Sequence, residues 1–369
     1  MSLARYLEFE GFSLILVNVK KLANEKMNKG STNPEIVRIQ FQEMKDIFEG
    51  ILKKNGFQDR KAATCANVFA ENSLEGVYTH GVNRFARFIK YIKRGFIKVA
   101  AEPELVRALG AIEQWNGNSG AGPLNAIICT ERGIEISKKF GIGCVALANT
   151  NHWMRAGYYG WMAAKTGFVF IGWTNTIRNM PAWGAVDPRL GNNPLVLAVP
   201  FGKEAIVLDM AMSQFSYGSI ESHKLRNELL SAAGGYNKNG ELTNDPSLIL
   251  ESKRLLPTGY WKGAGLSLLL DILAVVLSGG QSTMQVSKNK AEYGVSQVFI
   301  AIDISKLSNF SSIGGSVKEI IKDYSESIPE SEKQKILYPG ERVLITRKEN
   351  RAIGIPVDKE IWDEVKLLI

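Results

Sequence analysis

Apolar residues recur at spacings of three and four near both ends of the chain, which is the pattern of one face of an amphipathic helix. The clearest run starts near Phe41 and includes Met44, Ile47, Phe48, Ile51 and Leu52. Further helices are expected at 62–74, from Gly81 to a stop at Gly95, from the glycine-rich stretch 117–122 to about Phe140, and at 263–277, 317–324 and 359–369.

The middle of the chain has a different pattern. Short segments that are β-branched or apolar and bounded by Gly, Asn or Pro are typical of buried strands. These segments are 144–148, 168–174, 195–200, 206–210 and 298–302. We therefore expect a mixed α/β, non-Rossmann protein, with a helical lobe built from both termini around a central sheet lobe.

The length of 369 residues exceeds the size at which one compact core usually stops growing. We expect residues 1–36 to be an N-terminal extension, because they contain the turn-rich stretch 28–34. Residues 37–110 together with 306–369 are expected to form the helical lobe, and residues 111–305 the sheet lobe.

Composition and targeting signals point to an ordinary globular protein of a reducing compartment, and we expect the cytoplasm. The three cysteines form no C-x-x-C pair, which argues against a disulfide framework and a metal site. The apolar run 12–19 is too short for a membrane span and follows two glutamates instead of positive charge. The apolar stretch 266–277 is broken by Asp271, which favours a buried helix.

The formal net charge of +8 raises the question of nucleic acid, which needs Lys and Arg clustered on one face. The lysines of this chain are dispersed, so nucleic acid is not an expected partner. Short basic stretches such as 90–94 are typical of solvated faces. A modest positive field still favours an anionic substrate.

The segment 141–146 fits the dinucleotide fingerprint G-x-G-x-x-A, but its context is wrong for that function. A Rossmann loop follows a strand and opens a helix, whereas here a helix precedes and a strand follows. We interpret Gly141 as a helix stop. The Walker pattern and G-x-S-x-G are also absent from the sequence.

Only three histidines occur, and His80 has the most suggestive neighbours. Thr79 precedes it, and Arg84 follows four positions later, so a turn at Gly81 would place Arg84 one helical turn along on the same side. An arginine fork binds a carboxylate through two hydrogen bonds, and an adjacent imidazolium can protonate the neighbouring carbonyl oxygen. This outlines a 2-keto acid site; the alternative is a helix-capping histidine beside a surface arginine.

His152 lies just after an expected strand, where loops commonly carry function; the alternative is a structural histidine packed on Trp153. His223 has charged neighbours on an expected exposed helix and is assigned no role. Polar, glycine and aromatic residues also gather at 173–176, 181–184, 191–194 and 260–263. Such segments can line a pocket for a flat ring or form turns beneath a core tryptophan.

Several of these segments, in this order, resemble the type-2 malate/L-lactate dehydrogenase family, a non-Rossmann group of nicotinamide oxidoreductases. The resemblance runs from about Ile39 to the C-terminus. Its longest shared segments are 76–85, 110–115, 151–155 and 259–263. It implies an α/β protein with a helical lobe and a sheet lobe that holds the cofactor, acting as a homodimer.

The resemblance implies that His80 donates the proton in reduction and that Arg84 holds the substrate carboxylate. Thr79 stands where many family members have a serine that assists the histidine, so a hydroxyl is retained. His152 is implied as a cofactor contact. In some members, however, the matching histidine has the acid/base role, so His80 and His152 compete for it.

The resemblance also implies cofactor contacts from three stretches. They are Ala205, Ile206, Val207, Leu208, Asp209, Met210 and Ala211; Trp261 and Lys262; and Gly340, Glu341 and Arg342. Lys262 and Arg342 could meet phosphates, and Asp209 could accept a hydrogen bond from a ribose. The cofactor is expected to be NADH, with NADPH as an alternative.

Within the family the resemblance is strongest to members that act on 2,3-diketo-L-gulonate. It implies hydride transfer to the C2 carbonyl of this 2-keto acid, giving 3-dehydro-L-gulonate. One alternative is another 2-keto or 2-hydroxy acid, such as malate, lactate, ureidoglycolate or a cyclic imino acid. An alternative of another class is a non-catalytic binder of a small molecule or of nucleic acid.

Overall fold

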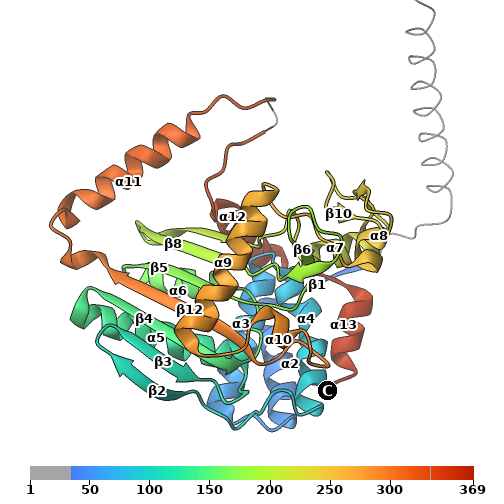
Figure 1. Ribbon diagram of the computed structural model, residues 1–369, viewed down its shortest axis with the longest axis horizontal. Helices are drawn as coiled ribbons and strands as arrows, with labels where there is room; N and C mark the ends of the chain where they lie inside the picture. The colour runs from blue at the N-terminus through green and yellow to red at the C-terminus, as the bar shows by residue number, and fades with distance from the viewer. Residues whose placement is uncertain (1–34, 333) are drawn as a thin grey trace, which may run out of the picture.

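The computed structural model describes residues 35–332 and 334–369 (Figure 1), so the apolar run 12–19 and nearly all of the expected extension 1–36 lie outside the described residues. The α-helices are α2 (Phe41–Lys54), α3 (Asp59–Leu74), α4 (Val82–Lys93), α5 (Gly122–Phe140), α6 (Gly157–Lys165), α7 (Tyr217–Leu225), α8 (Pro246–Ser252), α9 (Trp261–Ser278), α10 (Thr283–Val286), α11 (Phe310–Ser325), α12 (Glu341–Ile353) and α13 (Lys359–Lys366). Two short 3-10 helices are η1 (Tyr78–His80) and η2 (Ile304–Lys306).

The strands are β1 (Ile36–Ile39), β2 (Glu104–Leu109), β3 (Ile112–Asn116), β4 (Ile142–Thr150), β5 (Phe168–Thr174), β6 (Met180–Pro181), β7 (Pro188–Leu190), β8 (Leu195–Phe201), β9 (Glu204–Met210), β10 (Gly235–Tyr236), β11 (Leu242–Thr243), β12 (Val295–Asp303) and β13 (Ile355–Asp358). Over the described residues the main sheet has the order β2-β3-β4-β12-β5-β8-β9. Strands β3 and β4 pair in parallel, and the other neighbours pair antiparallel. The expected α/β class is therefore confirmed, with a mostly antiparallel sheet.

The helical part of the core is built by α2, α3, α4 and α13, with the β1–β13 pair beside them. The face predicted from residue 41 onward is buried, and Phe48 stacks on Phe85 with ring centroids 4.0 Å apart. The chain returns to this cluster at its end, through Trp362 and Val365. Residues near both termini of the described chain thus share one core.

The main sheet is covered on both faces because its central strands are apolar at successive positions. On β4, Val145 and Leu147 pack against α5 and α6, whereas Cys144 and Ala146 face the cluster that includes α9. Helix α5 ends at Gly141, which has a φ of +85° and starts the turn into β4. The interpretation of Gly141 as a helix stop is confirmed.

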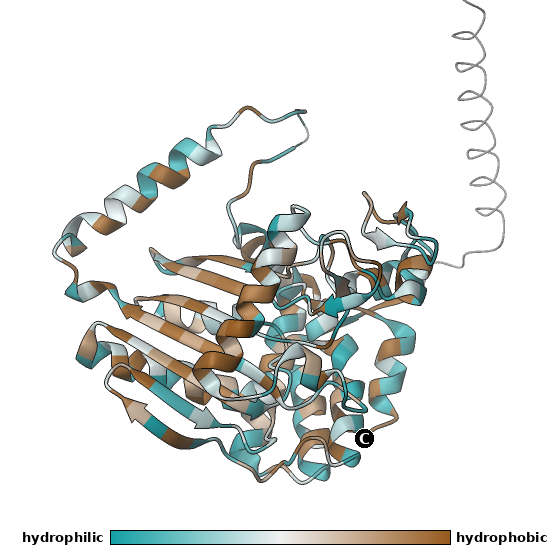
Figure 2. Ribbon diagram, in the orientation of Figure 1, coloured by the Kyte–Doolittle hydropathy of each residue, from teal (hydrophilic) through white to brown (hydrophobic). Residues whose placement is uncertain are grey.

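Helices α9 and α11 leave large apolar side chains exposed. Helix α9 lies against β12, β4 and β5 with one face, and Leu269 and Val276 are exposed on it. Figure 2 colours much of this helix as hydrophobic. The expectation of a buried helix at 266–277 is therefore wrong for the outer face. By length and composition α9 could cross a membrane. Helix α11 extends away from the sheet and contains no buried residue (Figure 1).

The strand and helix predictions mostly agree with these bounds, and two assignments need correction. Strand β2 falls within the range expected for the helical lobe, yet it belongs to the main sheet because it pairs with β3. Helix α11 also falls in that range, yet it contributes nothing to the helical core. The other boundaries of the two expected lobes stay a prediction.

Candidate active site

The segment from Thr79 to Arg84 is held against α3 by buried hydrogen bonds. The backbone N–H of Val82 donates to Ser73 Oγ at 2.9 Å, and Asn72 Nδ2 donates to the carbonyl of His80 at 3.0 Å. A Cβ added to Gly81 would overlap the Ser73 side chain, so this position requires glycine. The predicted turn at Gly81 is confirmed, and η1 and the start of α4 present Thr79, His80 and Arg84.

His80 and His152 come together from distant parts of the chain. Their rings are nearly parallel, at an interplanar angle of 18° and with centroids 5.5 Å apart. The two histidines differ in their hydrogen bonds. Thr79 Oγ1 lies 3.1 Å from His80 Nδ1, a contact that the hydroxyl can make as donor or acceptor.

The Nδ1 atom of His152 accepts a hydrogen bond from the backbone N–H of Met154 at 2.9 Å. The neutral ring must then carry its proton on Nε2, and a second proton on Nδ1 would break this bond. His80 has no such restriction. The hydrogen bonding therefore favours His80 over His152 as the group that changes its protonation state.

Arg84 faces both histidines and influences their charge. Burial lowers the pKa of His80 to about 3, and the nearby Arg84 cation adds to this effect. Burial also lowers the pKa of His152, helped by the charges of Arg84 and His80. Both imidazoles are consequently neutral near pH 7 in the free protein.

The three stretches expected to contact a cofactor adjoin one another along β9. Residues Ala205 to Met210 lie on this edge strand, and Ala211 follows it. The backbone N–H of Val207 donates to Pro339 O at 3.0 Å, which brings Gly340 against the strand. The N–H of Thr258 donates to Met212 O at 2.9 Å and so holds the loop that leads into Trp261.

The side chains of these stretches suit a phosphate-bearing ligand in part. Lys262, in the first turn of α9, and Arg342, in the first turn of α12, are both exposed cations. The carboxylate of Glu341 instead accepts a hydrogen bond from Tyr338 N–H at 3.3 Å, within its own segment. Gly340 has a φ of +95°, and an added Cβ would lie 3.1 Å from Val207 N, so glycine allows this segment to pack closely against β9.

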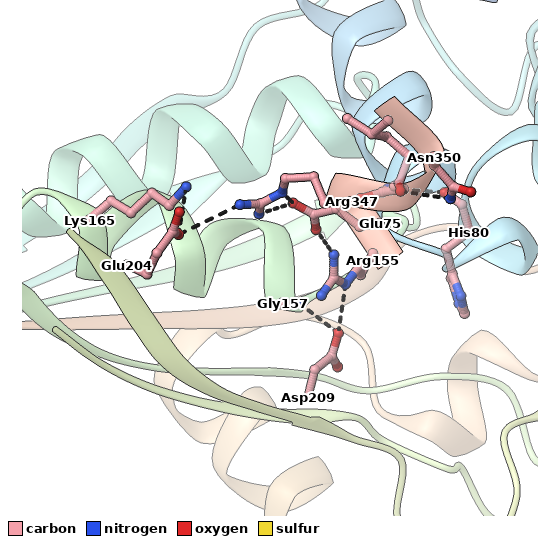
Figure 3. Close-up of polar contacts among 11 residues, drawn as sticks. Glu75, His80, Arg155, Gly157, Lys165, Glu204, Asp209, Arg347 and Asn350 are labelled. Carbon is pink, nitrogen blue, oxygen red and sulfur yellow. Dashed lines mark hydrogen bonds and ion pairs between the residues drawn. The ribbon is translucent and has the colours of Figure 1, made fainter. Parts of the chain in front are cut away.

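Asp209 belongs to a chain of charged side chains shown in Figure 3, of which Glu75 and Arg155 are buried. Its Oδ2 accepts a hydrogen bond from Gly157 N–H at 2.8 Å and lies 3.7 Å from Arg155 Nε. Burial raises the pKa of Asp209, while Arg155 and the Gly157 N–H oppose that rise. Among the described residues, Oδ1 has no hydrogen-bond partner. One carboxylate oxygen is thus fixed, and the other can accept a hydrogen bond from a ligand.

The centre of this chain is Glu75, which the sequence analysis missed. Its buried carboxylate pairs with Arg155 and with Arg347, and Arg347 also lies 3.6 Å from Glu204 (Figure 3). Glu75 follows α3, whereas Arg347 lies on α12, so these pairs join the helical core to the segment that is expected to contact the cofactor. Buried charges that are joined in this way could have been found only from the fold, because 272 positions separate Glu75 from Arg347.

The remaining candidates have structural surroundings. His223 lies on α7, where its Nδ1 is 2.8 Å from Ser219 O. Trp173 is buried and donates from Nε1 to Leu270 O at 3.0 Å, which supports the core-tryptophan interpretation of its segment. Trp183 and Tyr260 instead contact each other at the surface, with ring centroids 5.3 Å apart. No cluster of three metal-binding side chains occurs within residues 35–332 and 334–369.

Comparison with known proteins agrees with the geometry. The family model of malate/L-lactate dehydrogenase matches residues 39–366. The 2,3-diketo-L-gulonate reductase of Salmonella paratyphi C is 42% identical over 333 residues, which cover 90% of this chain and 100% of that protein. The namesake from Escherichia coli O6:K15:H31 has the same identity and coverage.

A solved structure of malate dehydrogenase from Entamoeba histolytica superposes with a TM-score of 0.86 at 26% identity, covering 90% of this chain and 97% of that chain. The fold, the family model and the sequence relatives agree over the same span of residues. The chain belongs to the malate/L-lactate dehydrogenase family.

Proposed function

We propose that this protein uses NADH to reduce 2,3-diketo-L-gulonate to 3-dehydro-L-gulonate, with His80 as the proton donor. The cofactor supplies a hydride to C2 of the keto acid, the carbonyl oxygen receives a proton, and NAD⁺ and a 2-hydroxy acid are the products. The substrate assignment is supported by the names of relatives at 42% identity. The proton donor is supported by the unequal hydrogen bonding of the two stacked histidines.

Arg84 binds the substrate carboxylate in this proposal. Its Nη2 lies 3.3 Å from Glu292 Oε2, and its other guanidinium nitrogens donate no hydrogen bond to any described residue. Those free N–H groups can bind a carboxylate and aim the adjacent C2 carbonyl at His80. The negative charge of the substrate opposes the effect of Arg84 on His80, so substrate binding favours the protonated imidazole.

In this proposal the cofactor binds along β9, and Asp209 determines the preference for NADH over NADPH. The free Oδ1 of this carboxylate accepts a hydrogen bond from a ribose hydroxyl, and its charge repels a 2′-phosphate. Lys262 and Arg342 supply positive charge for the pyrophosphate. Gly340 lets the segment that leads into Arg342 lie directly against β9. Thr79 orients the His80 ring through the contact at 3.1 Å.

We also expect a homodimer in the cytoplasm. The outer face of α9 and the side chains of α11 expose apolar area that a second copy can cover. Size-exclusion chromatography with light scattering would return twice the mass of one chain, and a monomer at micromolar concentration would contradict the dimer.

A substrate panel with two histidine variants tests the function. NADH oxidation is measured with 2,3-diketo-L-gulonate, oxaloacetate and pyruvate, and repeated with NADPH. His80→Ala should lose turnover by about a hundredfold or more while its NADH affinity, measured by fluorescence, stays unchanged. His152→Ala should retain more activity. Activity with pyruvate or oxaloacetate alone would contradict the assigned substrate, and a greater loss in His152→Ala would contradict the assigned acid.

A further inference from the structure

Glu292 is a carboxylate beside Arg84 that the proposed reduction does not use. Its Oε2 lies 3.3 Å from Arg84 Nη2, and the side chains of Glu292 and Arg84 are only 12% and 17% exposed. The two residues are 208 positions apart, so the fold brings a negative charge next to the arginine expected to hold the substrate.

The loop that carries Glu292 is fixed to the site by its neighbours. Tyr293 stacks on Phe96 with ring centroids 4.9 Å apart and an interplanar angle of 12°. Asn289 Nδ2 donates to the Tyr293 carbonyl at 3.1 Å. The carbonyl of Phe96 in turn accepts a hydrogen bond at 3.1 Å from Asn151, the residue before His152. Glu292 therefore lies in a supported position close to both Arg84 and the His152 loop.

We propose that Glu292 determines which 2-keto acids this site accepts, favouring substrates with hydroxyl groups and rejecting those with a second carboxylate. The proposal rests on the proposed function of the same site. Glu292 Oε1 accepts no hydrogen bond from any described residue, so it remains available to a substrate hydroxyl. A charged acceptor bonds a hydroxyl more strongly than a neutral acceptor does.

The same charge acts in the opposite direction on a dicarboxylate. With one acid group held by Arg84, a second carboxylate within a few ångströms of Glu292 is repelled, and partial burial leaves this repulsion poorly screened. A keto acid with neither a hydroxyl nor a second carboxylate meets the Glu292 charge only through the carboxylate on Arg84, which all three substrates share. The site thus selects substrates by the substituent on the carbon chain beyond the 2-keto group.

The variant Glu292→Gln tests this proposal with the three substrates of the panel. It keeps the size of the side chain and removes the charge. The kcat/KM for 2,3-diketo-L-gulonate should fall about tenfold, because a charge-assisted hydrogen bond is lost. The value for oxaloacetate should rise about tenfold, because the repulsion is gone. The kcat/KM for pyruvate should differ by less than about threefold between wild type and the variant.

The pair Arg87–Glu221 provides a matched control one turn further along α4. Its nitrogen and oxygen lie 3.5 Å apart, and its side chains are 44% and 35% exposed. Glu221→Gln removes the same charge from the same kind of ion pair and should leave the ranking of substrates unchanged. NADH affinity, measured by fluorescence titration, should be the same in wild type and both variants.

The outcomes separate the possible failures. If Glu292 only supports Arg84, Glu292→Gln lowers kcat/KM for all three substrates by the same factor, and the specificity proposal is overturned while the proposed function stands. An unchanged ranking in Glu292→Gln has the same meaning. If wild type oxidises NADH with none of the three substrates, the proposed function itself is overturned, and the role of Glu292 falls with it.

Discussion

The neutral state of His80 in the free protein predicts a specific loss of stability at acid pH. An unfolded histidine has a pKa of about 6.5, and in the folded protein the pKa of His80 is lowered to about 3. Between these values the unfolded chain binds a proton that the folded chain does not. Stability contributed by this group is therefore present above pH 6.5 and is lost as the pH falls toward 3.

The magnitude follows from linkage. Between pH 7.5 and pH 5.0 the free energy of unfolding should fall by about 2 kcal/mol through His80 alone. The full shift of the His80 pKa from about 6.5 to about 3 limits the total loss at lower pH to about 5 kcal/mol. At pH 5.0 the result depends little on the folded pKa, since any value well below 5 leaves the ring neutral. Partial exposure of His80 to solvent makes the calculated loss an upper bound.

Urea denaturation followed by tryptophan fluorescence measures this loss in wild type and in His80→Gln. The variant has no titrating ring at this position, so its stability should decrease by about 2 kcal/mol less between the two pH values. Retained NADH affinity in His80→Gln at pH 7.5 is the control for an intact fold. Equal pH dependence in both proteins would refute the reasoning, because His80 would then carry the same charge in the folded and unfolded states.

Three other predictions concern neighbouring parts of the site. Glu75→Gln leaves buried arginines without their carboxylate and should lower the free energy of unfolding by about 3 kcal/mol or more in urea denaturation, and a loss below about 1 kcal/mol would contradict this. Gly340→Ala should weaken NADH binding about tenfold in a fluorescence titration, whereas Gly184→Ala, with a similar φ but open space around it, should leave NADH binding unchanged. Arg84→Lys loses the two-pronged contact and should raise KM for the keto acid about tenfold with a smaller change in kcat; steady-state kinetics showing only a lower kcat would contradict the role in binding.

Local sequence patterns were sufficient for the elements that bury one continuous apolar face. The strand expected at 168–174 matches β5, and the helix expected from Phe41 begins there. Strand β2 was missed because all of its residues are exposed, so nothing in its composition marks a core face. Helix α12 was missed because charged residues are distributed along the helix itself and interrupt its apolar pattern. Its placement depends on distant contacts such as that of Arg347 with Glu75.

The same distinction applies to the site. His80 and Arg84 lie one helical turn apart, so a spacing argument could pair them before any fold was known. Glu292 meets Arg84 across 208 positions, and Glu75 meets Arg347 across 272 positions, so no local pattern shows either contact. The order of the main sheet was likewise not predictable, because it inserts β12 between β4 and β5.

The contact between Asp209 and the first turn of α6 has a consequence for protein engineering. Helix α6 has Ala156 at its N-cap and no side-chain cap of its own. The carboxylate of Asp209 on β9 instead accepts the hydrogen bond from the Gly157 N–H at the start of the helix. If Asp209 has the proposed role in the choice of dinucleotide, a change at this position that removes the carboxylate would also remove this cap. A redesign for NADPH should therefore keep an acceptor for the Gly157 N–H, for example the amide oxygen of asparagine at position 209.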